Sequence, residues 1–181
     1  ATFFLLRGGS EPSQSTSVTS APALATTLAP DMTLTAASSA VPQLIASTTQ
    51  VYVGNTLTTS HNGRGLLEEG NGTAILLDYD TTFTLEESDG TGTHVSGSLA
   101  AGNVWARVEK VFGKGEYYKI KTQNAVAVVR GTSFGLSYRG GISKLQVATG
   151  TVGFMPVDPS TGEPIKTQKE VFVSGGNKAT I

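Results

Sequence analysis

The sequence of 181 residues contains no cysteine and only two histidines, His61 and His94. Without cysteine the chain can form no disulfide, offer no thiolate nucleophile and bind no metal through sulfur. Its 13 lysines and arginines nearly balance its 14 aspartates and glutamates, for a net charge of −1. A chain this close to neutral has no electrostatic reason to bind nucleic acid or an anionic membrane. We therefore expect partners to be recognised by shape and backbone pairing.

Long apolar runs are also missing. Residues 1–6 (ATFFLL) are apolar, but a bilayer span needs about 20 such residues. We expect no membrane span in this chain, and we interpret Ala1 as a mature N-terminus left by a peptidase; the alternative is the end of a removed anchor.

Strong helix formers are sparse, whereas threonine, serine, glycine and valine dominate. After Gln50 the chain consists of short apolar stretches separated by turn dipeptides, among them Asn62-Gly63, Asn71-Gly72 and Asp89-Gly90. Asn71-Gly72-Thr73 is also a glycosylation sequon, which we interpret first as a turn. The pattern predicts an all-β fold, an antiparallel β-sandwich or rolled sheet of about ten short strands.

The N-terminal quarter has a different composition, rich in serine, threonine, alanine and proline. We therefore divide the chain into an extended segment, residues 1–48, and a β-domain, residues 49–181. Three alternatives stay open for the segment: it adds a strand to a neighbouring subunit, it wraps its own domain, or it is an unordered tail. We favour strand addition and hence a homo-oligomer. The apolar residues expected to make this contact are Phe3, Phe4, Leu5, Leu6, Val18, Leu24, Leu28, Met32 and Leu34.

The most informative stretch is residues 126–136, VAVVRGTSFGL. A β-branched run ends at Val129, Arg130-Gly131 breaks it, and alternation resumes after Thr132 with Phe134. This pattern predicts two strands joined at a glycine corner. The same stretch contains a G-x-S-x-G match around Ser133, but a nucleophile elbow needs a helix after the serine, and strand and turn residues follow here.

Five pieces of the sequence, in order, resemble the FecR family of bacterial extracytoplasmic domains over residues 51–154. They are VGNTLTT (53–59), NGRG (62–65), LAAGNV (99–104), IKTQNAVAVVRGTSF (120–134) and VATGTV (147–152). The resemblance implies the all-β fold, and the family is best known for membrane-anchored regulators that relay a periplasmic signal to a sigma factor. Nothing in the sequence resembles the cytoplasmic helical segment that would hold the sigma factor, and Gln123 stands where the family has proline.

Other candidate sites depend on charge and aromatic residues. Asp78 and Asp80, with Glu86, Glu87 and Asp89 nearby, could offer oxygens to calcium, although a solvated carboxylate row is the simpler interpretation. Basic residues gather later in the chain, from Arg107 to Lys144. We expect acidic and basic strands to neutralise each other across a sheet, or else acidic and basic faces to meet between subunits.

Aromatic residues lie near those bases. Trp105, Tyr117 and Tyr118 could stack on single-stranded nucleic acid or sugar, but we expect Trp105 in the core. The sequence predicts a non-enzymatic, cofactor-free, extracellular or cell-surface domain that assembles into a filament or array. The alternative is a periplasmic FecR-type sensor domain that regulates a sigma factor.

Overall fold

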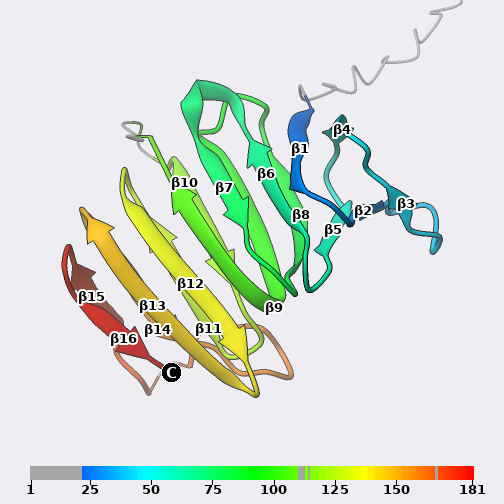
Figure 1. Cartoon of the computed structure of the whole chain (residues 1–181). Coiled ribbons are helices and arrows are strands. Elements are labelled where there is room, and N and C mark those ends of the chain that lie inside the picture. Colours follow the sequence, from blue (N-terminus) through cyan, green and yellow to red (C-terminus); the bar gives the residue numbers. More distant parts are fainter. Residues whose placement is uncertain (1–21, 110–112, 114, 166) are drawn as a thin grey trace, which may run out of the picture.

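A computed structural model describes residues 22–109, 113, 115–165 and 167–181 of the chain, and their regular secondary structure is almost all β-strand. The strands form two layers that share one strand (Figure 1). Sheet A has the order β4 (Thr48–Val51), β1 (Ala23–Ala29), β6 (Arg64–Glu68), β7 (Ala74–Leu77), β9 (His94–Arg107), β12 (Ser133–Arg139), β13 (Ile142–Thr149) and β16 (Lys178–Thr180). Sheet B has the order β3 (Gln43–Leu44), β2 (Met32–Thr35), β5 (Thr56–Thr59), β8 (Thr82–Ser88), β9, β10 (Tyr117–Lys121), β11 (Ala125–Val129), β14 (Thr151–Pro156) and β15 (Val171–Ser174).

The shared strand is β9, which passes from one layer into the other. Its first half pairs with β8 and β10, and its second half pairs with β7 and β12. The change takes place at Gly102, whose φ is +97° and where a Cβ would lie 2.3 Å from Thr81 Oγ1. Because L side chains are strained at such a φ and find no room here, glycine is required at this bend.

Elsewhere the chain alternates between the layers. Several crossings use a residue with positive φ: Asp31 between β1 and β2, Asp80 between β7 and β8, Gly131 between β11 and β12, and Gly150 between β13 and β14. The chain is therefore wound around a common interior, which agrees with the predicted sandwich or rolled sheet. One feature departs from the antiparallel prediction, since β10 pairs with β9 in parallel.

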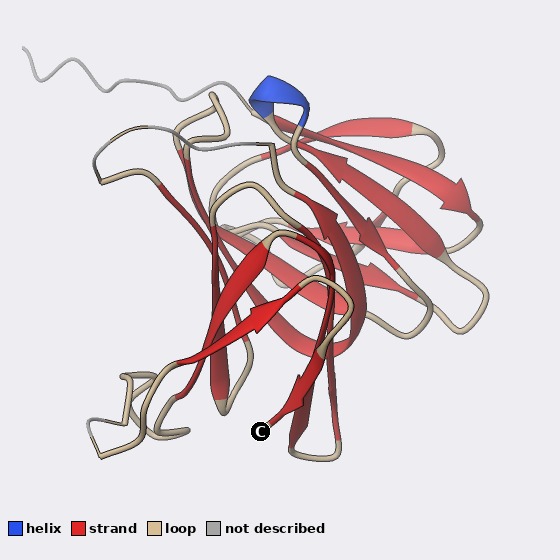
Figure 2. Ribbon diagram, turned by 90° about the vertical axis from the view of Figure 1, so that its left-hand side faces the viewer, coloured by secondary structure: helices blue, strands red, loops and turns tan. Residues whose placement is uncertain are grey.

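The core lies between the two layers (Figure 2). Burial alternates along the strands, as in β11 and β13, because successive side chains point to opposite faces. The largest fully buried side chains include Phe83, Tyr118, Phe134 and Phe154. One short 3₁₀ helix, η1 (Gly70–Gly72), connects β6 to β7 where the sequence predicted a tight turn. The described residues contain no helix with the length and apolar character that a bilayer crossing requires.

The described part of the N-terminal segment is built into the sandwich. β1 lies between β4 and β6, and β2 pairs with β5. The predicted division between residues 48 and 49 thus falls at the start of β4, a strand that pairs with β1. From Ala23 onward, this segment takes its hydrogen-bonding partners from its own chain.

Candidate interaction surfaces

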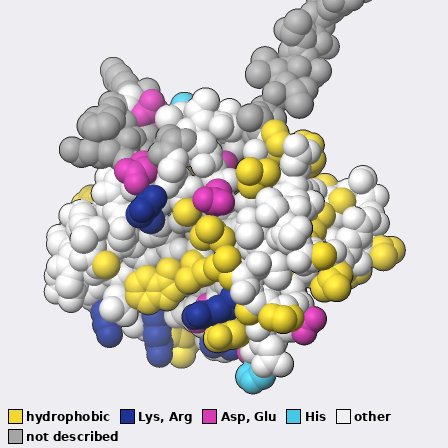
Figure 3. Space-filling model, turned by 45° about the horizontal axis from the view of Figure 1, so that its top comes forward, with side chains coloured by type: hydrophobic (Ala, Val, Ile, Leu, Met, Phe, Trp, Pro, Cys, Tyr) yellow, Lys and Arg dark blue, Asp and Glu magenta, His cyan; other side chains and the backbone are white. Residues whose placement is uncertain are grey.

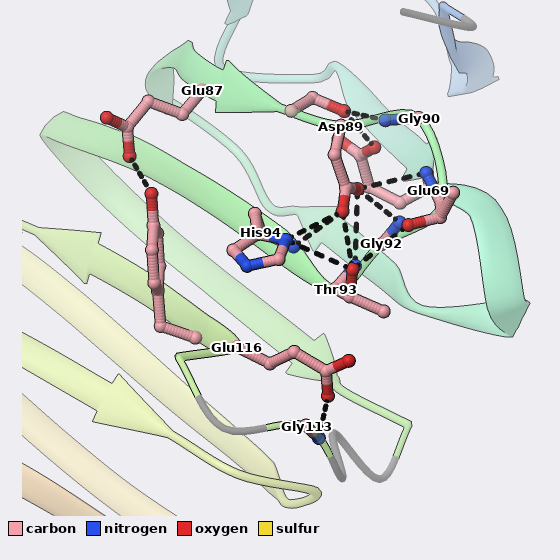
Figure 4. A network of polar contacts seen from close by, with 12 residues as sticks. Glu69, Glu87, Asp89, Gly90, Gly92, Thr93, His94, Gly113 and Glu116 are labelled. Atoms are coloured by element: carbon pink, nitrogen blue, oxygen red, sulfur yellow. Dashed lines mark hydrogen bonds and ion pairs between the residues drawn. The ribbon is translucent and has the colours of Figure 1, made fainter.

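The loop from β8 to β9 is organised around one carboxylate. Asp89 accepts hydrogen bonds from the backbone N–H groups of Thr91 (3.0 Å), Gly92 (2.9 Å), Thr93 (3.3 Å) and His94 (3.1 Å). The Thr93 hydroxyl adds another at 2.5 Å (Figure 4). Burial raises the pKa of Asp89, but the hydrogen bonds from Thr93, His94 and Thr91 outweigh it and hold the pKa well below its ordinary value. The carboxylate therefore fixes the loop in one conformation.

Threonine, histidine and aspartate meet in this loop, as in a catalytic relay, but the geometry does not support one. Thr93 Oγ1 and Asp89 Oδ2 lie 3.2 Å and 2.9 Å from the same imidazole nitrogen, Nδ1 of His94. A relay needs the nucleophile on one ring nitrogen and the carboxylate on the other. The His94 ring instead packs edge-on against Tyr117, with 5.4 Å between ring centroids. This cluster is a structural support for the loop.

Beneath the loop lies a second polar group. Glu69 is buried, and Ser88 Oγ donates a hydrogen bond to its Oε2 at 2.9 Å. Its Oε1 and the hydroxyl of the fully buried Tyr118 find no hydrogen-bond partner among the described residues. Burial raises the pKa of Glu69, and burial with the nearby Glu69 charge raises the pKa of Tyr118 well above its ordinary value. Burial therefore disfavours the charged form of this carboxyl group.

Charged side chains form rows across β8, β9 and β10. Lys121 Nζ lies 2.9 Å from Glu86, and Lys119 Nζ lies 3.9 Å from Glu87. The Tyr117 hydroxyl donates a hydrogen bond to Glu87 at 3.0 Å. These contacts span β9 because its outward positions carry small residues, Ser96 and Ser98. The predicted neutralisation of acidic by basic strands is confirmed within this chain.

The acidic residues considered for calcium are not brought together. Asp78 is bound to Arg64 at 2.8 Å, and Asp80 lies 3.1 Å from Nδ1 of His61. The part of the chain that the structure describes holds no group of three or more histidine, aspartate or glutamate side chains arranged for a metal ion.

The glycine corner lies where the sequence predicted it. Val129 ends β11 in sheet B, Gly131 has φ +72°, and β12 begins in sheet A at Ser133. Thr132 and Phe134 are buried, whereas Arg130 is exposed. A Cβ on Gly150 would lie 2.5 Å from Thr132 Cγ2, so this corner packs against the one between β13 and β14. A strand, not a helix, follows Ser133, as expected for a structural corner.

The residues predicted to mediate assembly fall into three groups. Phe3, Phe4, Leu5, Leu6 and Val18 lie outside the described residues. Leu24 and Leu28 are exposed on β1, at 44% and 55%. Met32 and Leu34 are buried in the core of their own chain.

Trp105 is not in the core, and this expectation was wrong. Its side chain is 43% exposed on the outer face of sheet A, in a groove of about 360 Å³. Lys144, Gln146 and Lys178 also line this groove. On the face shown in Figure 3, hydrophobic side chains adjoin lysine and arginine side chains. Alternation along β9 could have revealed this position, since Val104 and Ala106 are the buried neighbours.

Comparisons with known proteins agree with this architecture. The family model described as FecR protein matches residues 55–153, from the residue before β5 into β14. Two crystal structures of a protein from Parabacteroides distasonis ATCC 8503, provisionally named an anti-sigma factor, match with a TM-score of 0.55 at 14% and 15% identity. Each match covers 70% of this chain and 54% of the other, so the chain spans about half the length of that protein. No curated protein is significantly similar in sequence. Because the FecR model covers more than half of the residues and the sandwich is shared, this chain belongs to the FecR family.

Proposed function

We propose that this chain is the extracytoplasmic part of a FecR-type signal-transduction protein, a non-enzymatic domain that relays a periplasmic signal to a sigma factor. The observation that carries the proposal is the FecR match, which extends from residue 55 to residue 153. The fold shared with the Parabacteroides protein, itself provisionally named an anti-sigma factor, supports it. The surfaces described above suit binding better than chemistry, because the Asp89 cluster lacks the geometry of a relay.

The proposal concerns more than the described residues. Because the chain covers about half of the Parabacteroides protein, the sigma-factor contact is assigned to the whole protein and the sensing role to this domain. The surface filament considered from the sequence depends on the N-terminal segment, residues 1–48. Residues 1–21 of that segment lie outside the described part, and no observation on the described strands favours a filament.

The test is an in-frame deletion of residues 55–153 from the chromosomal gene, followed by RNA sequencing with and without the deletion. We expect the transcripts of one sigma-factor regulon to change together. Electron microscopy of the same cells, with and without the deletion, tests the alternative of a surface filament. Loss of surface fibres with unchanged transcription would overturn the signalling proposal.

A further inference from the structure

We propose that the groove on the outer face of sheet A binds a negatively charged oligosaccharide, with Trp105 as the platform for a sugar ring and Lys144 and Lys178 as partners of its acidic groups. Binding in this groove does not require that the chain act in signalling.

The orientation of Trp105 is the first observation. Trp105 pairs with Gly135 of β12, and a Cβ on Gly135 would lie 3.1 Å from Cδ2, Cε2 and Cε3 of the indole. The ring therefore lies against the glycine with one face, which leaves the other face toward solvent. Its Nε1–H donates no hydrogen bond to any described residue. A flat aromatic ring fixed in this way offers a stacking surface to the apolar C–H face of a sugar.

Polar side chains continue from the ring in two rows. The first row runs from Trp105 through Gly135 and Gln146 to Lys178, each paired with the next across neighbouring strands. The second row, two residues along, runs from Asn103 through Ser137 to Lys144. All of these residues line the groove. The side chains of Asn103, Ser137 and Gln146 form no hydrogen bond with another described residue. Amide and hydroxyl groups left free beside an aromatic platform can exchange hydrogen bonds with sugar hydroxyls.

The charge of the groove indicates the class of sugar. Its one carboxylate, Asp78, is already bound to Arg64 through Nη2 at 2.8 Å and Nε at 2.9 Å. Lys144 and Lys178 are exposed and form no ion pair with a described residue. The groove therefore carries an excess of positive charge and favours an anionic ligand such as a uronic-acid strand.

Two other anionic partners fit the groove less well. Nucleic acid binding depends on many phosphate contacts, and this groove offers two lysines on a chain of net charge −1. An acidic peptide would use backbone pairing along an edge such as β16, which makes no use of the indole face.

The chain provides its own probe for this site, because Trp105 is its single tryptophan. We would titrate the protein with tetrasaccharides of galacturonate, mannuronate and hyaluronate and follow tryptophan fluorescence. The neutral methyl ester of the galacturonate, an oligothymidylate and oligoglutamate serve as comparison ligands. We expect at least one acidic tetrasaccharide to change the fluorescence saturably and to bind about tenfold more tightly than the neutral ester.

Variants locate the binding. Lys144→Gln and Lys178→Gln should each weaken binding of the acidic ligand about threefold, since the two lysines share a tenfold advantage, and leave binding of the neutral ester unaffected. Lys121→Gln, on the opposite sheet, is the matched control and should change neither. Calorimetry of Trp105→Ala should show loss of binding to both, with an unchanged melting temperature as evidence of folding. The proposal would be overturned if no acidic tetrasaccharide changed the fluorescence, or if the lysine variants bound the acidic ligand as tightly as the parent protein does. It would also be overturned if oligoglutamate or oligothymidylate bound more tightly than every acidic tetrasaccharide.

Discussion

The ring of Phe83 on β8 occupies the space beside Gly97 on β9 where other residues carry a side chain. A Cβ on Gly97 would lie 2.1 Å from Phe83 Cζ, and Phe83 is 1% exposed. The backbone of Gly97 does not have positive φ, so space alone requires glycine there. The pair joins β8 to the shared strand and closes the core at that point.

Gly97→Ala should therefore overpack the core and lower the free energy of unfolding by about 1–3 kcal/mol. Chemical denaturation measures this change. Ser98→Ala, one residue along and facing outward, is the control and should stay within about 0.5 kcal/mol of the parent. Equal stability of Gly97→Ala and the parent would show that Phe83 can move aside.

Met32 and Leu28 separate a structural role of the N-terminal strands from a role in assembly. Met32 is fully buried, with its sulfur 2.1 Å from where a Gly65 Cβ would lie, whereas Leu28 is 55% exposed. Met32→Ala should cost about 2–5 kcal/mol, because it leaves a cavity. Leu28→Ala should change stability by less than about 0.5 kcal/mol. Thermal denaturation of both variants measures these changes in stability, and light scattering measures their oligomeric state. A Met32→Ala protein as stable as the parent would contradict the pairing of β2 into the sandwich.

Asp89→Asn should destabilise the protein in a pH-dependent way. Because hydrogen bonds hold the pKa of Asp89 below the unfolded value of 3.8, the charged carboxylate stabilises the fold above that pH. The advantage is lost as pH falls from 3.8 toward the lower folded pKa. We expect the variant to be less stable than the parent by about 1.5–3 kcal/mol at pH 7, the range of hydrogen bonds to a charged group, and this difference to narrow below pH 4.

Denaturation at a series of pH values measures the difference. Glu109→Gln is the control, because its contact with Arg107 at 3.5 Å is exposed and should contribute little. A deficit that stays constant down to pH 2 would mean that the asparagine variant loses packing and not charge.

Glu69→Gln should act in the opposite direction. Burial raises the pKa of Glu69 above the unfolded value of 4.5, so its contribution is most favourable below pH 4.5 and is lost as pH rises through the folded pKa. We expect the variant to melt at a higher temperature than the parent at pH 8 and the gap to close toward pH 4. Glu68→Gln, its exposed neighbour, should show no such trend. A variant that is less stable at pH 8 would mean that the charged form has a favourable partner.

Local pattern carried much of the fold. The alternation around Val129 and Phe134, broken at Gly131, was sufficient to predict two strands and a corner, because strand burial has a period of two. The five sequence pieces that resemble FecR indicated the family, and the match to the FecR family model confirmed it. Composition alone could not indicate that residues 23–35 pair with β4, β5 and β6, since such pairing depends on backbone groups and hardly on side-chain type.

The candidate groove was missed for a related reason. Trp105 was expected in the core, but its position in β9 faces outward. Lys178 and Trp105 are far apart in the sequence and meet through the pairing of β9, β12, β13 and β16. No short stretch of sequence determines the register of four strands, so this site could be found only in the three-dimensional structure.

The passage of β9 through both layers has a mechanical consequence. Sliding one layer over the other would require the ladder on one half of β9 to break while the other half stays intact. The two sheets therefore cannot slide or separate independently. We expect them to unfold together in a single cooperative step. A force that pulls on one layer is therefore transmitted through β9 to the strands of the other layer.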